Sequence, residues 1–229
     1  MPISRFPIPQ NKNMTILEKI ETHGQAVLLK QIPPDLTHCP CCKKEHQFFK
    51  FHEARSRLFL VVISCFVHLV NSFLGRWKCP FCNRTFTYYP EHAIPYKNYV
   101  KDSIVNLSQT YVEYDNITYR QVVQHGISVI AYKAEKGIDE RCLAGSTVYR
   151  WLSWIGSLKE PLRHALNMIR QKDPSCYIFR QIRPISSHKY QSINRIKILD
   201  TCLRFFAVEK KYNALFNRSI FPRFATGFI

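Results

Sequence analysis

The stretch Arg76-Trp77-Lys78-Cys79-Pro80-Phe81-Cys82-Asn83-Arg84 holds two cysteines that are separated by two residues, the first of them proline. The same CPxC spacing occurs once more upstream, in Cys39-Pro40-Cys41-Cys42. Two intervening residues let one tight turn direct both sulfurs at a metal ion, and zinc takes four such ligands in a tetrahedron. The two pairs therefore predict one structural zinc ion in a small zinc ribbon, bound by Cys39, Cys42, Cys79 and Cys82.

Residues beside the cysteines fit such a site. Asn83 follows the second pair, and asparagine tolerates the left-handed conformation that these turns often need. Lys43 and Arg84 would offset the negative charge of the thiolates. Four cysteines leave no open position for water, whereas a catalytic zinc keeps one. We therefore expect the metal to be a scaffold that performs no chemistry.

The other cysteines lead to different predictions. The chain has 9 cysteines, an odd number, and pairs with ligand spacing do not indicate disulfides. Cys41 is too close in sequence to Cys39 to bind the same ion, and His46 stays open as an alternative ligand or a solvated side chain. Ordinary buried thiols are expected at Cys65, Cys142, Cys176 and Cys202.

Charge and hydropathy limit the function classes. The 229-residue chain has a net charge of +17, from 33 Lys and Arg against 16 Asp and Glu, and such an excess attracts polyanions. Residues 1–15 carry prolines and no apolar segment, so we predict no secretory signal and a cytoplasmic location. The apolar run Leu58–Val70 is shorter than the roughly 20 residues that span a bilayer. We interpret it as a buried strand and expect no membrane partner.

Charge also divides the chain into three predicted parts. They are a zinc-ribbon domain with an N-terminal extension (1–95), a helix-turn-helix-like domain (96–158) and a basic helical tail (159–229). The first carries 12 basic and 6 acidic residues, the second 7 and 6, and the third 14 and 4. The predicted fold class is α+β, with a small antiparallel sheet followed by a mostly helical region, and the positive charge lies mainly in the ribbon and the tail.

The spacing of apolar residues predicts the individual elements. Strands are expected at Gln47–Phe51, Arg57–Phe66, Gly75–Lys78 and Thr85–Tyr89. Helices are expected at Tyr96–Tyr114, Thr118–His125, Ser146–Leu158 and Arg195–Lys211, with Ser146 as an N-cap.

One helix has the composition of a DNA-reading helix. Short polar residues lie at its N-terminus, where a helix in the major groove meets base edges. The predicted contacts are Ser146, Thr147, Tyr149 and Arg150, of which the arginine can reach guanine or phosphate. A rival placement takes Gly126 as the tight turn and 128–136 as the reading helix. Plain helical packing without DNA contact is the third interpretation.

The tail combines basic and aromatic residues. Lys210 and Lys211 belong to a series of cations between residues 180 and 223 that could contact phosphates of double-stranded DNA. Arg84 of the ribbon is predicted to contribute in the same way. The alternative for the tail is a solvated helix face.

No sequence feature indicates an enzyme. Metal-dependent strand transfer needs clustered carboxylates, and after residue 158 the acidic residues are only Glu160, Asp173, Asp200 and Glu209. P-loop, GxSxG and HExxH motifs are absent from the sequence. We therefore predict a protein without catalytic activity.

The second cysteine pair and its surroundings carry a family resemblance. The run Arg76–Phe86, followed by Tyr89-Pro90 and Ile94-Pro95-Tyr96, resembles the N-terminal zinc ribbon of bacterial insertion-sequence transposases and related stand-alone mobile-element proteins. Ser146–Trp151 also resembles that group, and the resemblance covers roughly residues 36–158. It implies a zinc-dependent DNA-binding protein with an accessory or regulatory role in a mobile element, since the separate catalytic domain is missing. Two alternatives stay open, a module that recruits a transposase or recombinase and an RNA-binding protein.

Overall fold

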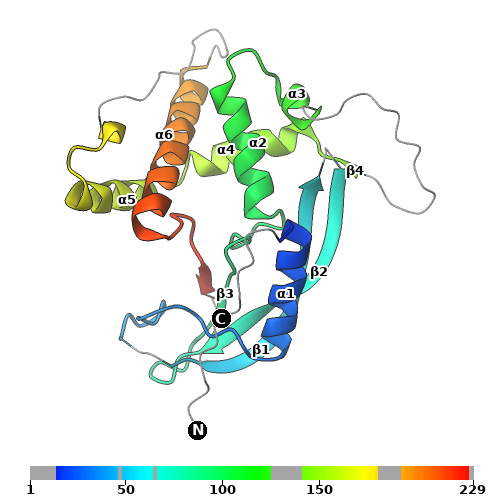
Figure 1. The fold of residues 1–229 in the computed structure, drawn as a ribbon, viewed down its shortest axis with the longest axis vertical. Coiled ribbons are helices and arrows are strands. Elements are labelled where there is room, and N and C mark those ends of the chain that lie inside the picture. The colour runs from blue at the N-terminus through cyan, green and yellow to red at the C-terminus, as the bar shows by residue number, and fades with distance from the viewer. Residues whose placement is uncertain (1–13, 46–47, 64–65, 125–140, 180–191, 227–229) are drawn as a thin grey trace.

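The computed structural model describes residues 14–45, 48–63, 66–124, 141–179 and 192–226, which form a mixed fold of helices and antiparallel strands (Figure 1). The strands are β1 (Lys50–Ile63), β2 (Phe66–Lys78), β3 (Thr85–Tyr88), β4 (Arg141–Cys142) and β5 (Phe224–Thr226). The helices are α1 (Ile16–Leu28), α2 (Lys101–Glu113), α3 (Tyr119–Gln124), α4 (Gly145–Ile155), α5 (Lys159–Lys172) and α6 (Ile193–Phe216), with a 3₁₀ turn η1 at Tyr177–Phe179. The mixed class is as predicted, whereas the zinc-ribbon and helix-turn-helix assignments and the division at 95 and 158 stay predictions.

A long hairpin organises the sheet. β1 and β2 pair from Lys50 opposite Lys78 to Ile63 opposite Phe66, with an irregularity between Phe51 and Glu53. β3 pairs with the end of β2 and β5 pairs with β3, while β4 pairs with the start of β2 at the far end of the hairpin. The last strand of the chain therefore returns to the strand that follows the second cysteine pair.

The apolar run that we predicted as one buried strand lies in two strands. Phe59 and Val61 are fully buried, but Leu58, Ile63 and Leu69 are 38%, 37% and 57% exposed. The predicted strand Arg57–Phe66 is confirmed up to Ile63, where β1 ends, but its predicted end was wrong because Phe66 begins β2. Among the described residues, no helix has the length and hydropathy needed to cross a membrane.

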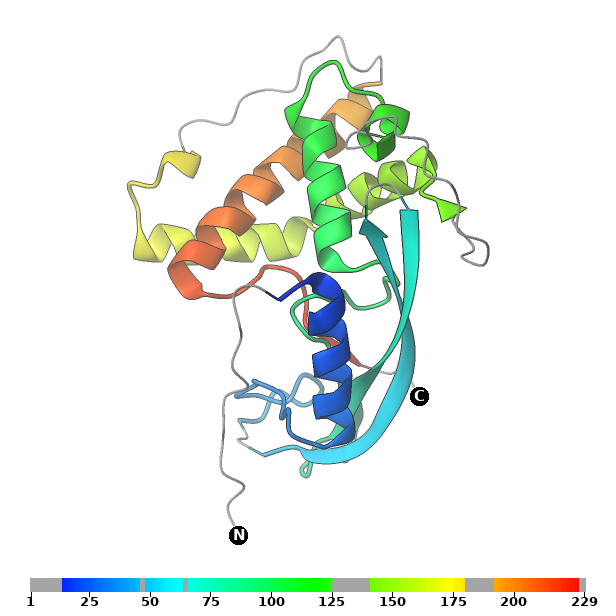
Figure 2. The same cartoon turned by 45° about the vertical axis from the view of Figure 1, so that its right-hand side comes forward.

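Helix α1 was not predicted, and it covers one side of the hairpin (Figure 2). Thr15 and Glu18 form a capping box at its start. Ile20 is fully buried, and its carbonyl oxygen accepts a hydrogen bond of 2.9 Å from Ser72 Oγ. A Cβ atom on Gly24 would lie 2.3 Å from that Oγ, so the close approach of helix and strand requires glycine.

The remaining helices share a second, larger core, in which α6 contacts α2, α4 and α5. α6 exceeds the predicted range Arg195–Lys211 at both ends. α2 starts later than predicted, because Tyr96 has a positive φ of 63° and residues 98–100 pair with the edge of β1. The side chains that are essentially inaccessible to solvent in this core are Ile94, Ile104, Val148, Leu152, Ile155, Ile169, Cys202, Phe205 and Val208.

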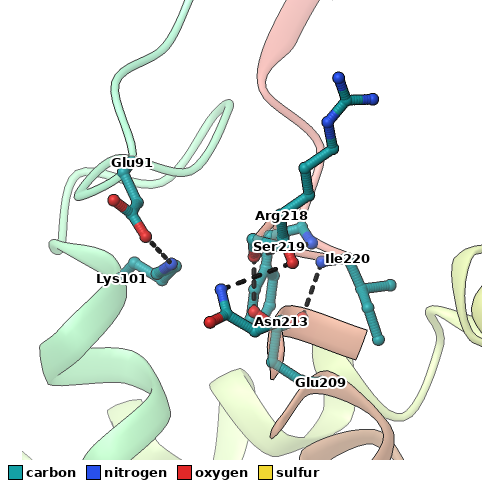
Figure 3. A network of polar contacts seen from close by, with 8 residues as sticks. Glu91, Lys101, Glu209, Asn213, Arg218, Ser219 and Ile220 are labelled. Carbon is teal, nitrogen blue, oxygen red and sulfur yellow. Dashed lines mark hydrogen bonds and ion pairs between the residues drawn. The ribbon is translucent and has the colours of Figure 1, made fainter. Parts of the chain in front are cut away.

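A polar network fixes the turn that leads from α6 back to the sheet (Figure 3). The Glu209 carboxylate accepts hydrogen bonds from Ser219 Oγ at 2.6 Å and from the Ile220 amide at 2.7 Å. Tyr89 N then donates to Arg223 O at 2.7 Å, just before β5. These bonds join the helical tail to the cysteine-bearing end of the sheet.

Candidate metal centre and polar face of α4

The two cysteine turns have the same backbone geometry. In the first, Lys43 N donates to Cys39 O and Cys39 N donates to Lys44 O, both at 2.9 Å. In the second, Asn83 N donates to Cys79 O and Cys79 N to Arg84 O, both at 3.0 Å. We call these turns the first knuckle (39–44) and the second knuckle (79–84).

The knuckles bring four sulfurs together. The Sγ atoms of Cys39, Cys42, Cys79 and Cys82 all lie within 4.8 Å of one another. The Cys39–Cys82 and Cys42–Cys79 distances are both 3.9 Å. Sulfurs placed tetrahedrally about 2.3 Å from one zinc ion would be about 3.8 Å apart. The four predicted ligands could therefore hold a metal ion in this arrangement.

The end of the hairpin positions the two knuckles. Cys39 and Cys79 are fully buried in a cluster with Phe49, Trp77 and Phe86. The Phe49 and Phe86 rings meet edge to face with centroids 5.0 Å apart. The second knuckle connects β2 to β3, so the paired strands fix the entry and exit of the chain. Cys39 and Cys79 are thus covered by the aromatic cluster, whereas Cys42 and Cys82 are half-buried.

The thiols differ in acidity. Burial would raise the pKa of Cys79, but amide hydrogen bonds from Cys82 and Phe81 lower it to about 7. Burial and thiol neighbours raise the pKa of Cys82 to about 11, and burial raises that of Cys39. A thiolate at Cys79 opposes ionisation of Cys39 and Cys82. A bound cation would remove this opposition.

The other cysteines agree with their predictions where the structure describes them. Cys176 and Cys202 are buried thiols, and Cys202 Sγ lies 3.2 Å from Leu152 O. Burial raises the pKa of Cys202 to about 12. Cys41 is half-buried, with its amide 3.3 Å from Cys39 Sγ. His46 and the side chains of Cys65 and Cys142 lie outside the described residues.

Helix α4 presents most of its predicted contact residues to solvent. Ser146, Tyr149 and Arg150 are exposed and Thr147 is half-buried. The prediction of Ser146 as N-cap was wrong, because the helix starts at Gly145 and Ala144 takes that position without a side-chain hydrogen bond. The rival reading helix at 128–136, with its turn at Gly126, lies outside the described residues.

Glycine lets α4 approach α3 closely. A Cβ atom on Gly145 would lie 3.1 Å from Tyr119 Cβ and 3.4 Å from Arg120 N. Val148 and Leu152 of α4 are fully buried, so the opposite side of the helix faces solvent. The contact therefore fixes the angle at which α4 presents its polar residues.

The sequence did not predict the role of Arg195, a buried residue that contacts side chains of this face. Arg195 is only 8% exposed, and it donates to Ser153 Oγ at 2.9 Å and to Tyr119 Oη at 2.5 Å. Its guanidinium lies 4.0 Å from the ring centroid of Tyr149. Within the described residues no acidic side chain pairs with it, and its Nε has no hydrogen-bond partner. No signal in the sequence indicates that Arg195 is buried, since an arginine in a basic tail is expected to be a surface cation.

The remaining predicted contacts lie elsewhere. Arg84 is exposed in the second knuckle, and this turn lies at the opposite end of the molecule from α4 (Figure 1). Lys210 is exposed on α6. The Lys211 ammonium instead pairs with the Asp173 carboxylate at 2.9 Å, which joins α6 to the end of α5. The structure therefore does not bring the predicted contacts into one cluster.

Comparison with protein-family models, with curated proteins and with solved structures gives no match.

Proposed function

We propose that this chain is a DNA-binding protein with one structural zinc ion, in which the exposed face of α4 contacts double-stranded DNA. The observation that supports it most directly is the cluster of four sulfurs within 4.8 Å, a shell that four thiolates close completely. Thiolates in pairs of CPxC spacing favour zinc over the hard cations, which prefer oxygen ligands. A closed shell leaves no position for substrate or water, so the proposal includes no catalytic role.

Two features support DNA as the partner of α4. Ser146, Tyr149 and Arg150 are exposed on one helix, and short polar side chains at a helix N-terminus suit contact with base edges. The net charge of +17 supplies the general attraction for a polyanion. In this proposal the cations of α6 and of the knuckles raise affinity, whereas Arg150 selects sequence.

An accessory role in a mobile element is the finer part of the proposal. It is supported by the resemblance of residues 36–158 to the ribbon region of insertion-sequence transposases, and by the lack of clustered carboxylates in the tail. A transposase or recombinase is accordingly the protein partner that we would test first.

A salt series tests duplex binding. The zinc-loaded protein is titrated with labelled duplexes of varied sequence at rising salt concentration. Steeply falling affinity together with a preference for one sequence is expected. Arg150→Ala should remove the preference, by roughly tenfold or more for the preferred site, since a bidentate arginine contact discriminates by about 1–3 kcal/mol. Arg163→Ala, which removes another exposed cation, on α5, should leave the preference unchanged. Absence of duplex binding at low salt would exclude the proposal.

A second candidate is a protein-interaction module. It is favoured by Leu58, Ile63 and Leu69, which are between 37% and 57% exposed on the hairpin. Under this alternative, Leu58→Ser with Leu69→Ser would abolish capture of a transposase, and the salt series would show only weak binding that is independent of sequence.

A further inference from the structure

Two phenylalanine rings are exposed at the knuckle end of the hairpin. Phe48, just before β1, is 69% exposed, and Phe81, inside the second knuckle, is 56% exposed. Contact of a phenyl ring with water is unfavourable because the ring forms no strong hydrogen bonds. Two exposed rings at one end of the hairpin therefore indicate a contact surface. Neither ring belongs to the buried aromatic cluster that supports the sulfurs.

Three lysines share this end of the molecule. Lys50 and Lys78 are direct partners in the β1–β2 register, and like charges in that relation destabilise a sheet. The ammonium of Lys44 lies 5.5 Å from the ring centroid of Phe81. Within the described residues none of these lysines has an ion pair with an acidic side chain. The neighbouring Glu53 is instead held by Arg55 and Arg76, at 2.8 and 2.9 Å.

Phe48 and Lys50 flank a buried ring. Phe49 is 9% exposed and packs on Phe86. Phe48 and Lys50, on either side of Phe49, are exposed, and Lys78 lies opposite Lys50 on the same face of the hairpin. The Lys44–Phe81 contact joins the two knuckles beside it. We name the set Lys44, Phe48, Lys50, Lys78 and Phe81 the knuckle face.

We propose that the knuckle face binds unpaired nucleotides of a single-stranded nucleic acid. Bases stack on the phenyl rings, and the lysines contact the phosphates that join those bases, which is the combination that single-strand binders use. A regular duplex does not suit this surface, because its bases are already stacked on one another. The inference rests on the proposed function only in taking nucleic acid as the partner, and it uses a surface separate from α4.

Single-strand affinity tests the knuckle face. The zinc-loaded full chain is titrated with fluorescent oligonucleotides of about 10 nucleotides, dT and rU, a length within the range that single-strand sites cover. Phe48→Ala and Phe81→Ala should each weaken binding about tenfold, and Lys50→Glu with Lys78→Glu should weaken it further. Leu69→Ala is the matched control, since it removes an equally exposed apolar side chain at the other end of the hairpin. The dT and rU strands both supply bases that can stack and phosphates, and the stronger ligand of the two shows which kind of strand the surface prefers.

A tryptophan variant separates stacking from loss of structure. Phe48→Trp should keep wild-type affinity, and its fluorescence should be quenched when the oligonucleotide binds. Zinc content and thermal midpoint show whether each alanine variant is folded. Alanine variants that stay folded and bind single strands like the wild type would overturn the inference, as would an unquenched Phe48→Trp complex.

The two proposals fail separately. Phe48→Ala should leave the duplex preference unchanged, and Arg150→Ala should leave single-strand affinity unchanged. Single-strand binding without duplex binding would refute the role of α4 and support the knuckle face. Duplex binding without single-strand binding would refute the knuckle face as a single-strand site and support the role of α4.

Discussion

Lys43 and Asn83 occupy equivalent positions in the two knuckles. Both have a left-handed backbone, with φ of 62° and 56°, and each amide donates to the carbonyl of the first cysteine of its own turn. Only glycine and asparagine adopt this conformation readily, and any other residue there adds strain. The second knuckle therefore has a residue suited to its turn, whereas the first does not. The two halves of the candidate metal site therefore share one backbone conformation but not one residue type.

Asn83→Val should weaken the second knuckle, because a β-branched side chain is disfavoured at positive φ. We expect a loss of unfolding free energy of about 1–2 kcal/mol and a lower zinc affinity in competition with a chromophoric chelator. Lys43→Gly should raise the unfolding free energy or leave it unchanged. Equal stability of Asn83→Val and the wild type would show that the turn tolerates the strain.

Removal of the metal should unfold the knuckle end and spare the helices. The purified chain is expected to carry about one zinc, and Cys79→Ser should retain none. Cys176→Ser, a buried thiol outside the site, is the control and should retain zinc. In a chelated sample, hydrogen exchange should accelerate around Phe49 and Phe86, whose cluster surrounds the sulfurs. Unchanged exchange there after chelation would contradict a structural role for the metal.

The sequence predicted those parts of the fold that leave a local signature. The ligand spacing identified the four cysteines that come together, and Asn83 was expected to be left-handed. Helix α1 left a signature too, the Thr15–Glu18 capping box, which was not used. The pairing of β5 with β3 has no local signal, since residues 224–226 contact strands more than 130 positions earlier.

The polar face of α4 shows what sequence alone could not supply. Ser146 has the chemistry of an N-cap, yet the N-cap lies two residues earlier, at Ala144, and Gly145 packs closely against α3. An arginine such as Arg195 is usually a surface cation, yet tertiary packing buries it against the ring of Tyr149. Both outcomes depend on neighbours that are distant in the chain.

Lys210 and Lys211 should differ in their effect on DNA binding. Lys210 is exposed and available to phosphate, whereas the Lys211 ammonium is held by Asp173 at 2.9 Å. This ion pair raises the pKa of Lys211 and lowers that of Asp173, so both stay charged near neutral pH. Lys210→Ala should reduce the slope of log affinity against log salt by about 1. Lys211→Ala should change it less, and an equal change for both would show that the ion pair opens on binding.

Acid should destabilise the protein through His23 and His92. Their rings meet at 5.6 Å between α1 and the segment that precedes α2. Burial is the main cause that lowers the pKa of His23 to about 4, and the charge of Arg223 adds to it. Burial also lowers the pKa of His92 to about 3, with smaller contributions from His23, Lys19 and Lys101. Unfolding restores values near 6.5, so below that pH the unfolded chain binds more protons than the native state.

The stability should therefore be complete above about pH 6.5 and should fall toward pH 4, by up to about 1.4 kcal/mol per pH unit for each histidine. Urea unfolding of the zinc-loaded protein at pH 5 and 7 measures this fall. His92→Phe should reduce it, and since both proteins carry the same knuckles, any acid release of metal cancels in the comparison. The same pH dependence in both proteins would rule out the histidine pair as its cause.

Arg195→Met should separate stability from recognition. A buried guanidinium without a carboxylate partner is costly to desolvate, so an apolar side chain of similar length should change the unfolding free energy by no more than about 1 kcal/mol. Ser153 Oγ keeps its bond to Tyr149 O at 2.9 Å, but the cation beneath the Tyr149 ring is gone. We therefore expect a weaker sequence preference with an unchanged salt slope, measured in the same duplex titration. Arg195→Lys should restore a cation beneath the Tyr149 ring without the two directed hydrogen bonds, and it should therefore recover part of the preference. If Arg195→Met kept the full preference, the support of Tyr149 by Arg195 would have no part in DNA recognition.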